Sequence, residues 1–270
     1  MVSYDIIGDI AIIKTRKEIL HQIKSIAEKI LREHKNVKVV CLNRGVKGEF
    51  RTRDLEIIAG EKRTVTTHVE YGVKIEVDVG KCFFTPRLAY ERTRVAKQVK
   101  KDQIVVDMFT GVAPFALIIA KYANPKVVYA IDKNPHAIKF AYKNVSRNKL
   151  LHKIELIEGD AKEVVKNLYK RGVKADHVIM NLPFSAYTFL EDALLLLPED
   201  ATMMIHYYDI IDKENVEDRA GQIEETLLKR KVSTKIKNLR MIKTYSPREV
   251  YIGIDIEVCR RSSAGRAGDL

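Results

Sequence analysis

The first third of the chain mixes helical and strand periodicities. Over residues 18–34 apolar side chains recur at intervals of three and four, the spacing of a helix that buries one face. A short apolar run at 37–42 predicts a strand. Two further runs, 64–69 and 73–79, flank a Tyr-Gly pair in the pattern of a hairpin. These elements predict a small α+β domain over residues 1–95.

The remainder of the chain shows strands that alternate with helices. A helix is predicted over residues 86–100, and from 104 onward apolar runs predict five strands, at 104–106, 127–131, 154–157, 176–180 and 201–207. Such alternation is typical of an α/β fold with a doubly wound, mostly parallel sheet. Residues 96–259 are therefore expected to form a Rossmann-like domain, with an antiparallel or edge strand at 250–258. Residues 260–270 lack periodicity and are expected to be a disordered tail.

Composition adds a strong positive charge to this picture. The 270 residues carry a formal net charge of +12, with 46% hydrophobic and 31% charged residues, as in a globular protein. Basic residues are concentrated at 81–101 and 229–248, and the glycine-containing stretch 43–54 is predicted to be a positively charged loop. An anionic partner such as nucleic acid is one explanation, and lysine-rich solvated faces are the other.

Other features exclude several classes of protein. No stretch approaches the ~20 apolar residues that span a bilayer, and the N-terminus does not resemble a signal peptide. The three cysteines are far apart, which argues against a disulfide framework, and the histidines lack metal-ligand spacing. A cytoplasmic protein without a metal is expected.

Three acidic residues each follow a predicted strand: Asp107, Asp132 and Asp160. The carboxyl ends of parallel strands share one edge of a sheet, where ligands bind. Gly111 permits a tight turn after the first strand, but the dinucleotide fingerprint GxGxxG is absent. This combination favours a nucleoside cofactor without a pyrophosphate, with Asp132 placed to accept the ribose hydroxyls. Ordinary solvated strand ends are the alternative.

The fourth strand ends in NLPF, residues 181–184. The Asn181 amide offers a donor and an acceptor to a ring edge, Pro183 fixes the backbone, and the aromatic residue that follows can stack on a base. A plain turn into the next helix is the alternative.

Taken in order, DMFTGVAPF, AIDKNPHAI, GDA and NLP resemble class I S-adenosylmethionine-dependent methyltransferases. With GEFRTRDLEIIAGE, FFTPRLAYERTRV, MNLPFSAYTFL and KTYSPREV, the sequence is similar to the archaeal and eukaryotic tRNA (guanine-37-N1)-methyltransferase family over about residues 4–258. A related family performs aminocarboxypropyl transfer in the wybutosine pathway. Two departures stand out: Ala113 replaces the second glycine of the usual GxG turn, and Phe83 stands where tyrosine is frequent.

The resemblance implies S-adenosylmethionine as cofactor and the anticodon stem-loop of tRNA, at guanosine 37, as substrate. Glu91 would be the general base and Arg51 the donor to guanine O6, with Arg53 as the rival donor. Asn181 and Pro183 would hold the guanine. The implied cofactor-binding residues are Phe84, Arg92, Asp107, Phe109, Gly111, Asp132, Lys133, Asp160, Ala161 and Asn181.

Several alternatives remain open. At the same nucleotide, the enzyme could methylate C7 of a tricyclic wyosine intermediate or transfer an aminocarboxypropyl group. Methylation of an exocyclic amine is another, because NLPF is close to the (D/N)PP(Y/F) signature. A non-catalytic RNA-binding module is a third. A monomer is expected.

Overall fold

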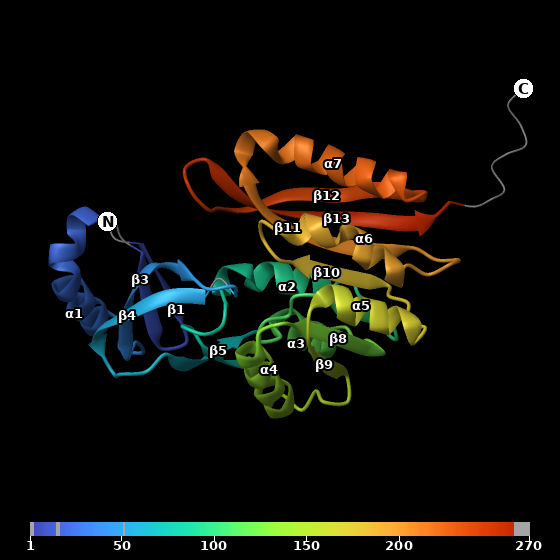
Figure 1. Ribbon diagram of the computed structural model, residues 1–270. Helices are drawn as coiled ribbons and strands as arrows, with labels where there is room; N and C mark the ends of the chain where they lie inside the picture. Colours follow the sequence, from blue (N-terminus) through green and yellow to red (C-terminus); the bar gives the residue numbers. More distant parts are fainter. Residues whose placement is uncertain (1–2, 15–16, 51, 262–270) are drawn as a thin grey trace, which may run out of the picture.

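The computed structural model describes residues 3–14, 17–50 and 52–261. The chain forms two units that lie side by side, with the N-terminal unit at one end (Figure 1). This unit is a four-stranded sheet in the order β1-β2-β3-β4, with strands β1 Ser3–Ile7, β2 Ile10–Lys14, β3 Val39–Lys47 and β4 Thr52–Gly60. Helix α1, Ile23–Glu33, packs its apolar stripe of Ile23, Ala27 and Ile30 on one face of the sheet.

The prediction of a loop at residues 43–54 is wrong over most of that stretch. Strand β3 continues to Lys47 and β4 begins at Thr52. A register shift between Asn43 and Val46 accommodates Gly45 at φ 136°. Glycine can adopt that backbone conformation within a bulge, so charge and glycine content concealed a strand.

The second unit is built on a seven-stranded sheet in the order β12-β13-β11-β10-β7-β8-β9. Its strands are β7 Ile104–Asp107, β8 Val127–Asp132, β9 Ile154–Glu158, β10 His177–Asn181, β11 Met203–Asp212, β12 Val232–Thr244 and β13 Glu249–Arg260. Strands β7 to β11 are parallel. β13 is antiparallel and lies between β11 and β12. The doubly wound, mostly parallel sheet is confirmed, and the strand predicted at 250–258 is antiparallel but internal.

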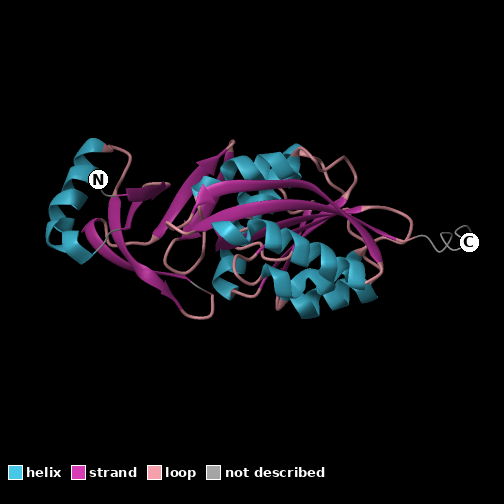
Figure 2. Cartoon of the chain, turned by 90° about the horizontal axis from the view of Figure 1, so that it is seen from above, coloured by secondary structure: helices cyan, strands magenta, loops and turns pink. Residues whose placement is uncertain are grey.

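Helices cover both faces of this sheet (Figure 2). One face carries α2 Ala89–Ala96, α3 Pro114–Tyr122 and α4 Pro135–Arg147, and the other carries α5 Ala161–Lys170, α6 Leu190–Ala193 and α7 Val216–Lys229. Successive side chains of a strand point to opposite faces, so Val105 joins the first core and Val106 the second. The helix predicted over 86–100 is shorter, since it follows a 3₁₀ turn at Pro86–Leu88 and ends at Ala96.

A hairpin of β5 Val65–Glu70 and β6 Val73–Asp78 links the two units. Its turn residues Tyr71 and Gly72 have φ of 46° and 67°, the left-handed pair of a tight hairpin turn. The buried Asn144 of α4 accepts from the Glu76 N–H at 2.7 Å and donates to the Glu76 carbonyl at 2.9 Å. The hairpin therefore pairs with a helix side chain as if with another strand.

The predicted tail begins inside a strand, because Arg260 ends β13. Residues 262–270 lie outside the described residues. Among the helices of the described ranges, none combines the length and apolar character needed to cross a bilayer.

Candidate active site

The strand order reverses at the boundary between β7 and β10, where a doubly wound sheet opens a crevice at its carboxyl edge. Asp107 ends β7 there and is 1% exposed. Its Oδ2 accepts from the Thr110 hydroxyl at 2.8 Å, while Oδ1 has no partner among the described residues. Burial raises the pKa of Asp107 to about 7. An orphaned buried oxygen in this crevice suits a cationic or N–H-bearing ligand.

The turn after β7 is tied to the next strand through Asp132. The Gly111 N–H, at φ +57°, donates to Asp132 Oδ2 at 2.6 Å, and the Asn134 N–H donates to Oδ1 at 2.8 Å. Burial raises the pKa of Asp132 against these hydrogen bonds. Ala113 precedes α3 with φ +68° and is fully buried. The family's second glycine is thus replaced by an alanine held in the left-handed region, at a cost of about 1 kcal/mol.

The other predicted cofactor residues on this edge follow the ends of β7, β8 and β9. Asp160 caps α5 by accepting from the Lys162 N–H at 3.0 Å, and Ala161 begins the helix and is buried. Lys133 is exposed and pairs with Glu49 at 2.7 Å and with Asp160 at 3.8 Å. Phe109 packs edge-on against Phe189 with a centroid separation of 4.9 Å.

Two other predicted cofactor residues lie deeper in the protein. The Arg92 guanidinium is 2% exposed, forms an ion pair with Glu70, and donates to the Thr85 carbonyl at 2.7 Å. It also lies 5.0 Å from the ring centroid of Phe84, which is itself buried. Both residues therefore lie in the core, and the contacts of Arg92 are with protein groups.

Glu91 is buried at 2% exposure and is surrounded by donors. Its Oε1 accepts from Arg240 Nε at 2.9 Å. Its Oε2 accepts from Arg240 Nη2 at 2.8 Å, Arg94 Nε at 3.0 Å and the Tyr208 hydroxyl at 3.1 Å. Burial favours a raised pKa for Glu91, but Arg240 and Arg94 outweigh it and hold the pKa below its usual value. Of the described arginines close to Glu91 in sequence, only Arg94 touches the carboxylate.

Tyrosines on adjacent strands connect Glu91 to the end of β10. Tyr208, on β11, donates to Glu91, and Tyr251, on β13, donates to Asn181 Oδ1. The two tyrosine rings are 6.3 Å apart. The structure therefore brings Glu91 and Asn181 into one constellation through residues that sequence reasoning missed. The alternation of β13 signalled that Tyr251 is in a strand but could not assign its partner.

The residue after Pro183 adopts an uncommon backbone conformation. Phe184 has φ +72°, and its N–H donates to the buried Asp209 at 2.9 Å. Its ring packs edge-on against Tyr245 of the predicted YSPR stretch, with centroids 5.9 Å apart. A left-handed non-glycine residue is typical of functional turns held by their surroundings.

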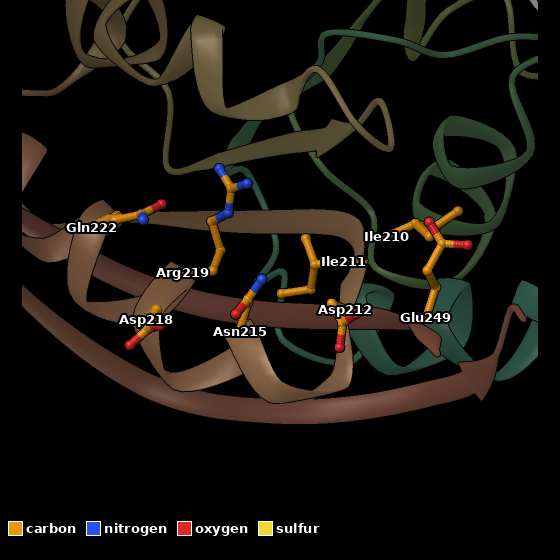
Figure 3. A pocket seen from close by; sticks show the side chains of 8 residues that line it. All are labelled: Ile210, Ile211, Asp212, Asn215, Asp218, Arg219, Gln222 and Glu249. Carbon is orange, nitrogen blue, oxygen red and sulfur yellow. The ribbon is translucent and has the colours of Figure 1, made fainter. Parts of the chain in front are cut away.

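A cavity of about 440 Å³ opens beyond this turn at the end of β11. Arg219 and Gln222 lie on one side of it, and Ile210 and Glu249 on the other (Figure 3). Arg219 is also 3.6 Å from Asp209, the carboxylate that accepts from the Phe184 N–H.

Of the two rival O6 donors, Arg51 lies outside the described residues. Arg53 is 8% exposed, donates Nη2 to the Phe84 carbonyl at 2.7 Å, and leaves Nη1 without a partner in the described part of the chain.

Arg53 belongs to a cluster of cations with Lys14, Arg87 and Lys243. Burial, followed by Arg87 and Lys14, lowers the pKa of Lys243 to about 8. Asp5 pairs with Arg87 at 2.6 Å.

The seven-stranded sheet with its inserted antiparallel strand, and the acids that end its first three strands, define a Rossmann-like class I methyltransferase, the class that uses S-adenosylmethionine. The chain belongs to the TRM5/TYW2 methyltransferase family. The model of that family's methyltransferase domain matches residues 66–236, and a TYW2 N-terminal domain model matches residues 1–64.

Individual relatives agree with this assignment. The tRNA (guanine(37)-N(1))-methyltransferase Trm5b of Pyrococcus abyssi is 40% identical over 258 residues, which cover 95% of this chain and 74% of that protein. A structure of aTrm5 with tRNALeu has a TM-score of 0.82 at 40% identity, over 94% of this chain and 71% of the other. Methanocaldococcus jannaschii TYW2, solved with AdoMet, has a TM-score of 0.71 at 26% identity, over 96% and 100%.

Proposed function

We propose that this protein transfers the methyl group of S-adenosylmethionine to N1 of guanosine 37 in tRNA. The observation that carries the proposal is that Glu91 accepts from Tyr208 and Asn181 accepts from Tyr251, while the centroids of the two tyrosine rings are 6.3 Å apart. The similarity to Pyrococcus abyssi Trm5b over nearly the whole chain supports the choice of reaction.

Guanine N1 carries a proton at neutral pH, so its lone pair becomes nucleophilic only when that proton leaves. Glu91 accepts the N1 proton, and its depressed pKa keeps it ionised in readiness. A cationic donor at O6 stabilises the charge that collects there. We assign this role to Arg51, because its planar guanidinium suits a carbonyl and stays charged, and Arg53 remains a candidate because its Nη1 has no partner among the described residues. Asn181 and Pro183 orient the base.

S-adenosylmethionine supplies an activated methyl group. The residues present fit it: Asp107 Oδ1, which has no partner among the described residues, can accept from a cationic amino group, Asp132 can accept from ribose hydroxyls, and we assign Asp160 and Ala161 to the adenine end. The N1–methyl bond forms as the sulfonium–methyl bond breaks, and the products are 1-methylguanosine, S-adenosylhomocysteine and the proton on Glu91.

Guanosine 37 must leave its stack to reach this pocket, and the RNA backbone must be held while it does so. The cluster of Lys14, Arg53, Arg87 and Lys243, with Asp5 as its acidic partner, carries an excess of positive charge suited to backbone phosphate.

The substitution Lys243→Met tests this contact. It should reduce the steepness of the plot of log tRNA affinity against log salt concentration by about one. An unchanged slope would remove Lys243 from the phosphate contacts.

The decisive experiment uses labelled S-adenosylmethionine with unmodified tRNA that carries either G37 or A37, followed by nucleoside identification. We expect 1-methylguanosine from the G37 tRNA alone. Product on A37 tRNA, or a different nucleoside from G37 tRNA, would refute the proposal. Label in the methyl group and, separately, in the aminocarboxypropyl group distinguishes methyl transfer from aminocarboxypropyl transfer.

A further inference from the structure

Arg240 approaches Glu91 from a distant part of the chain. It lies on β12, 149 residues from Glu91, and its Nε and Nη2 contact the two carboxylate oxygens at 2.9 and 2.8 Å. This two-point contact matches the planar fork of a guanidinium to a carboxylate and fixes the orientation of both groups. Arg94 and Tyr208 reach only Oε2.

Arg240 is itself braced by a second buried carboxylate. Its Nη1 lies 3.3 Å from Asp255 of β13. Asp255 is fixed in turn by Arg94 at 2.6 and 3.0 Å, by Gln98 at 3.2 Å, and by His206 Nδ1 at 2.8 Å. Two carboxylates and two guanidiniums balance in charge, so the cluster is tolerated in the core.

The charge state of Glu91 depends on this arrangement. Burial is the largest influence on Glu91 and opposes ionisation, whereas the hydrogen bond from Arg240 is the largest influence in favour of it, followed by the charges of Arg94 and Arg240. The groups that face Glu91 are Arg94 from α2, Tyr208 from β11, Arg240 from β12 and Tyr251 from β13, and Asp255 of β13 shares Arg94 and Arg240 with it. Without Arg240, only Arg94 and the Tyr208 hydroxyl would oppose the effect of burial, and the pKa of Glu91 would rise.

We infer that Arg240 is a positioning residue for catalysis, which holds the Glu91 carboxylate in place and ionised before guanine enters. The inference rests on the proposed role of Glu91 as base. When the guanine N1–H approaches, Arg240 can shift its fork toward Asp255, which it already neighbours, and leave an oxygen of Glu91 open to the proton.

The test is the pH dependence of a single methyl-transfer turnover at saturating cofactor with G37 tRNA. For Arg240→Gln, the ratio of the rate at pH 8 to the rate at pH 6 should exceed the wild-type ratio about fivefold or more, because a raised pKa leaves a larger fraction of Glu91 protonated at the lower pH. Arg240→Lys keeps the charge and should restore most of the wild-type ratio. Arg171→Gln loses a guanidinium that pairs with Glu155 at the exposed end of α5 and should behave as wild type.

A slower Arg240→Gln enzyme with an unchanged ratio would overturn the inference, since a purely structural role lowers the rate equally at both pH values. If Arg240→Gln does not fold, Arg240→Lys decides. Arg240→Lys keeps a charge but loses the two-point contact of the guanidinium. We therefore expect its methyl-transfer rate to fall at least threefold and its ratio of rates at pH 8 and pH 6 to be about twice that of the wild type. Wild-type rate and ratio would refute the inference. Full activity of Glu91→Gln would instead refute the proposed base.

Discussion

Two regions differ in how they are built: the cofactor edge, with Asp107, Asp132 and Asp160, and the Glu91 cluster, which consists of Glu91, Arg94, Arg240 and Asp255. At the cofactor edge, most side chains bond to backbone groups a few residues away, as Asp160 does with Lys162 and Asp132 with Asn134. In the Glu91 cluster, buried charges meet across long distances in sequence, 149 residues for Arg240 and 161 for the contact between Arg94 and Asp255. The first region consists mainly of local turns, which Asp132 joins by accepting from Gly111, and the second forms only when the sheet is complete.

This difference separates two contributions to one reaction. Local turns can bind a nucleoside with a geometry set by a few residues, so they tolerate changes elsewhere. The ionisation of Glu91 requires four elements, α2, β11, β12 and β13, to be packed correctly. Catalysis should therefore be more sensitive than cofactor binding to damage in the C-terminal part of the sheet.

The largest expected effect comes from substituting one residue in each region. Glu91→Gln removes the proton acceptor and should lower the single-turnover rate by at least about 100-fold, with cofactor Kd changed less than about threefold. Asp132→Asn removes a charged acceptor for ribose and should weaken cofactor binding about 10- to 100-fold. Calorimetric titration of the cofactor and quench-flow rates measure both.

Equal losses of rate and cofactor affinity in Glu91→Gln would reassign Glu91 to structure. Thermal unfolding of both variants serves as the control, because the loss of the Glu91 charge leaves two guanidiniums facing Asp255 alone.

A second substitution tests a long-range contact outside the cluster. Glu70→Gln leaves Arg92 buried without a counter-charge and should lower the free energy of unfolding by about 3–5 kcal/mol. Glu155→Gln, which breaks an exposed pair with Arg171, should cost less than about 1 kcal/mol. Urea denaturation compares them, and a similar small loss for both would show that Arg92 does not depend on Glu70.

These contrasts explain what the sequence could predict. Strands β7 to β11 and the acids at the ends of β7, β8 and β9 could be predicted, because each apolar run and the acid that follows it are adjacent in sequence. Strand β12 was missed because register shifts at Ile236/Asn238 and Met241/Lys243 interrupt its alternation, which left only a run of basic residues. Within that run, Arg240 reaches Glu91 because β12 pairs with β13, and no local sequence pattern encodes that pairing.

A third prediction concerns the far end of the buried network. His206 continues from Asp255 to His177 through imidazoles stacked with centroids 5.3 Å apart. Burial lowers the pKa of His177 from 6.5 to about 3, so the unfolded chain binds the proton first. The free energy of unfolding is therefore highest above pH 6.5 and falls as the pH drops toward 3, by about 2 kcal/mol at pH 5 from this group.

His177→Asn cannot titrate, so its loss of stability between pH 7.5 and pH 5, measured in urea, should be smaller than that of the wild type by about this amount. An identical loss in the two proteins would mean that His177 does not carry the acid sensitivity.

The smallest expected effect lies in the local region, at the departure from the family's glycine turn. Ala113→Gly relieves a left-handed alanine at φ +68°, and this gain offsets the lost methyl burial and the greater freedom of the unfolded chain. We expect a change in the free energy of unfolding within about 0.5 kcal/mol. Ala116→Gly, equally buried but inside helix α3, has no strain to relieve and should cost about 1–2 kcal/mol. Equal costs at the two positions would show that the turn holds alanine without strain.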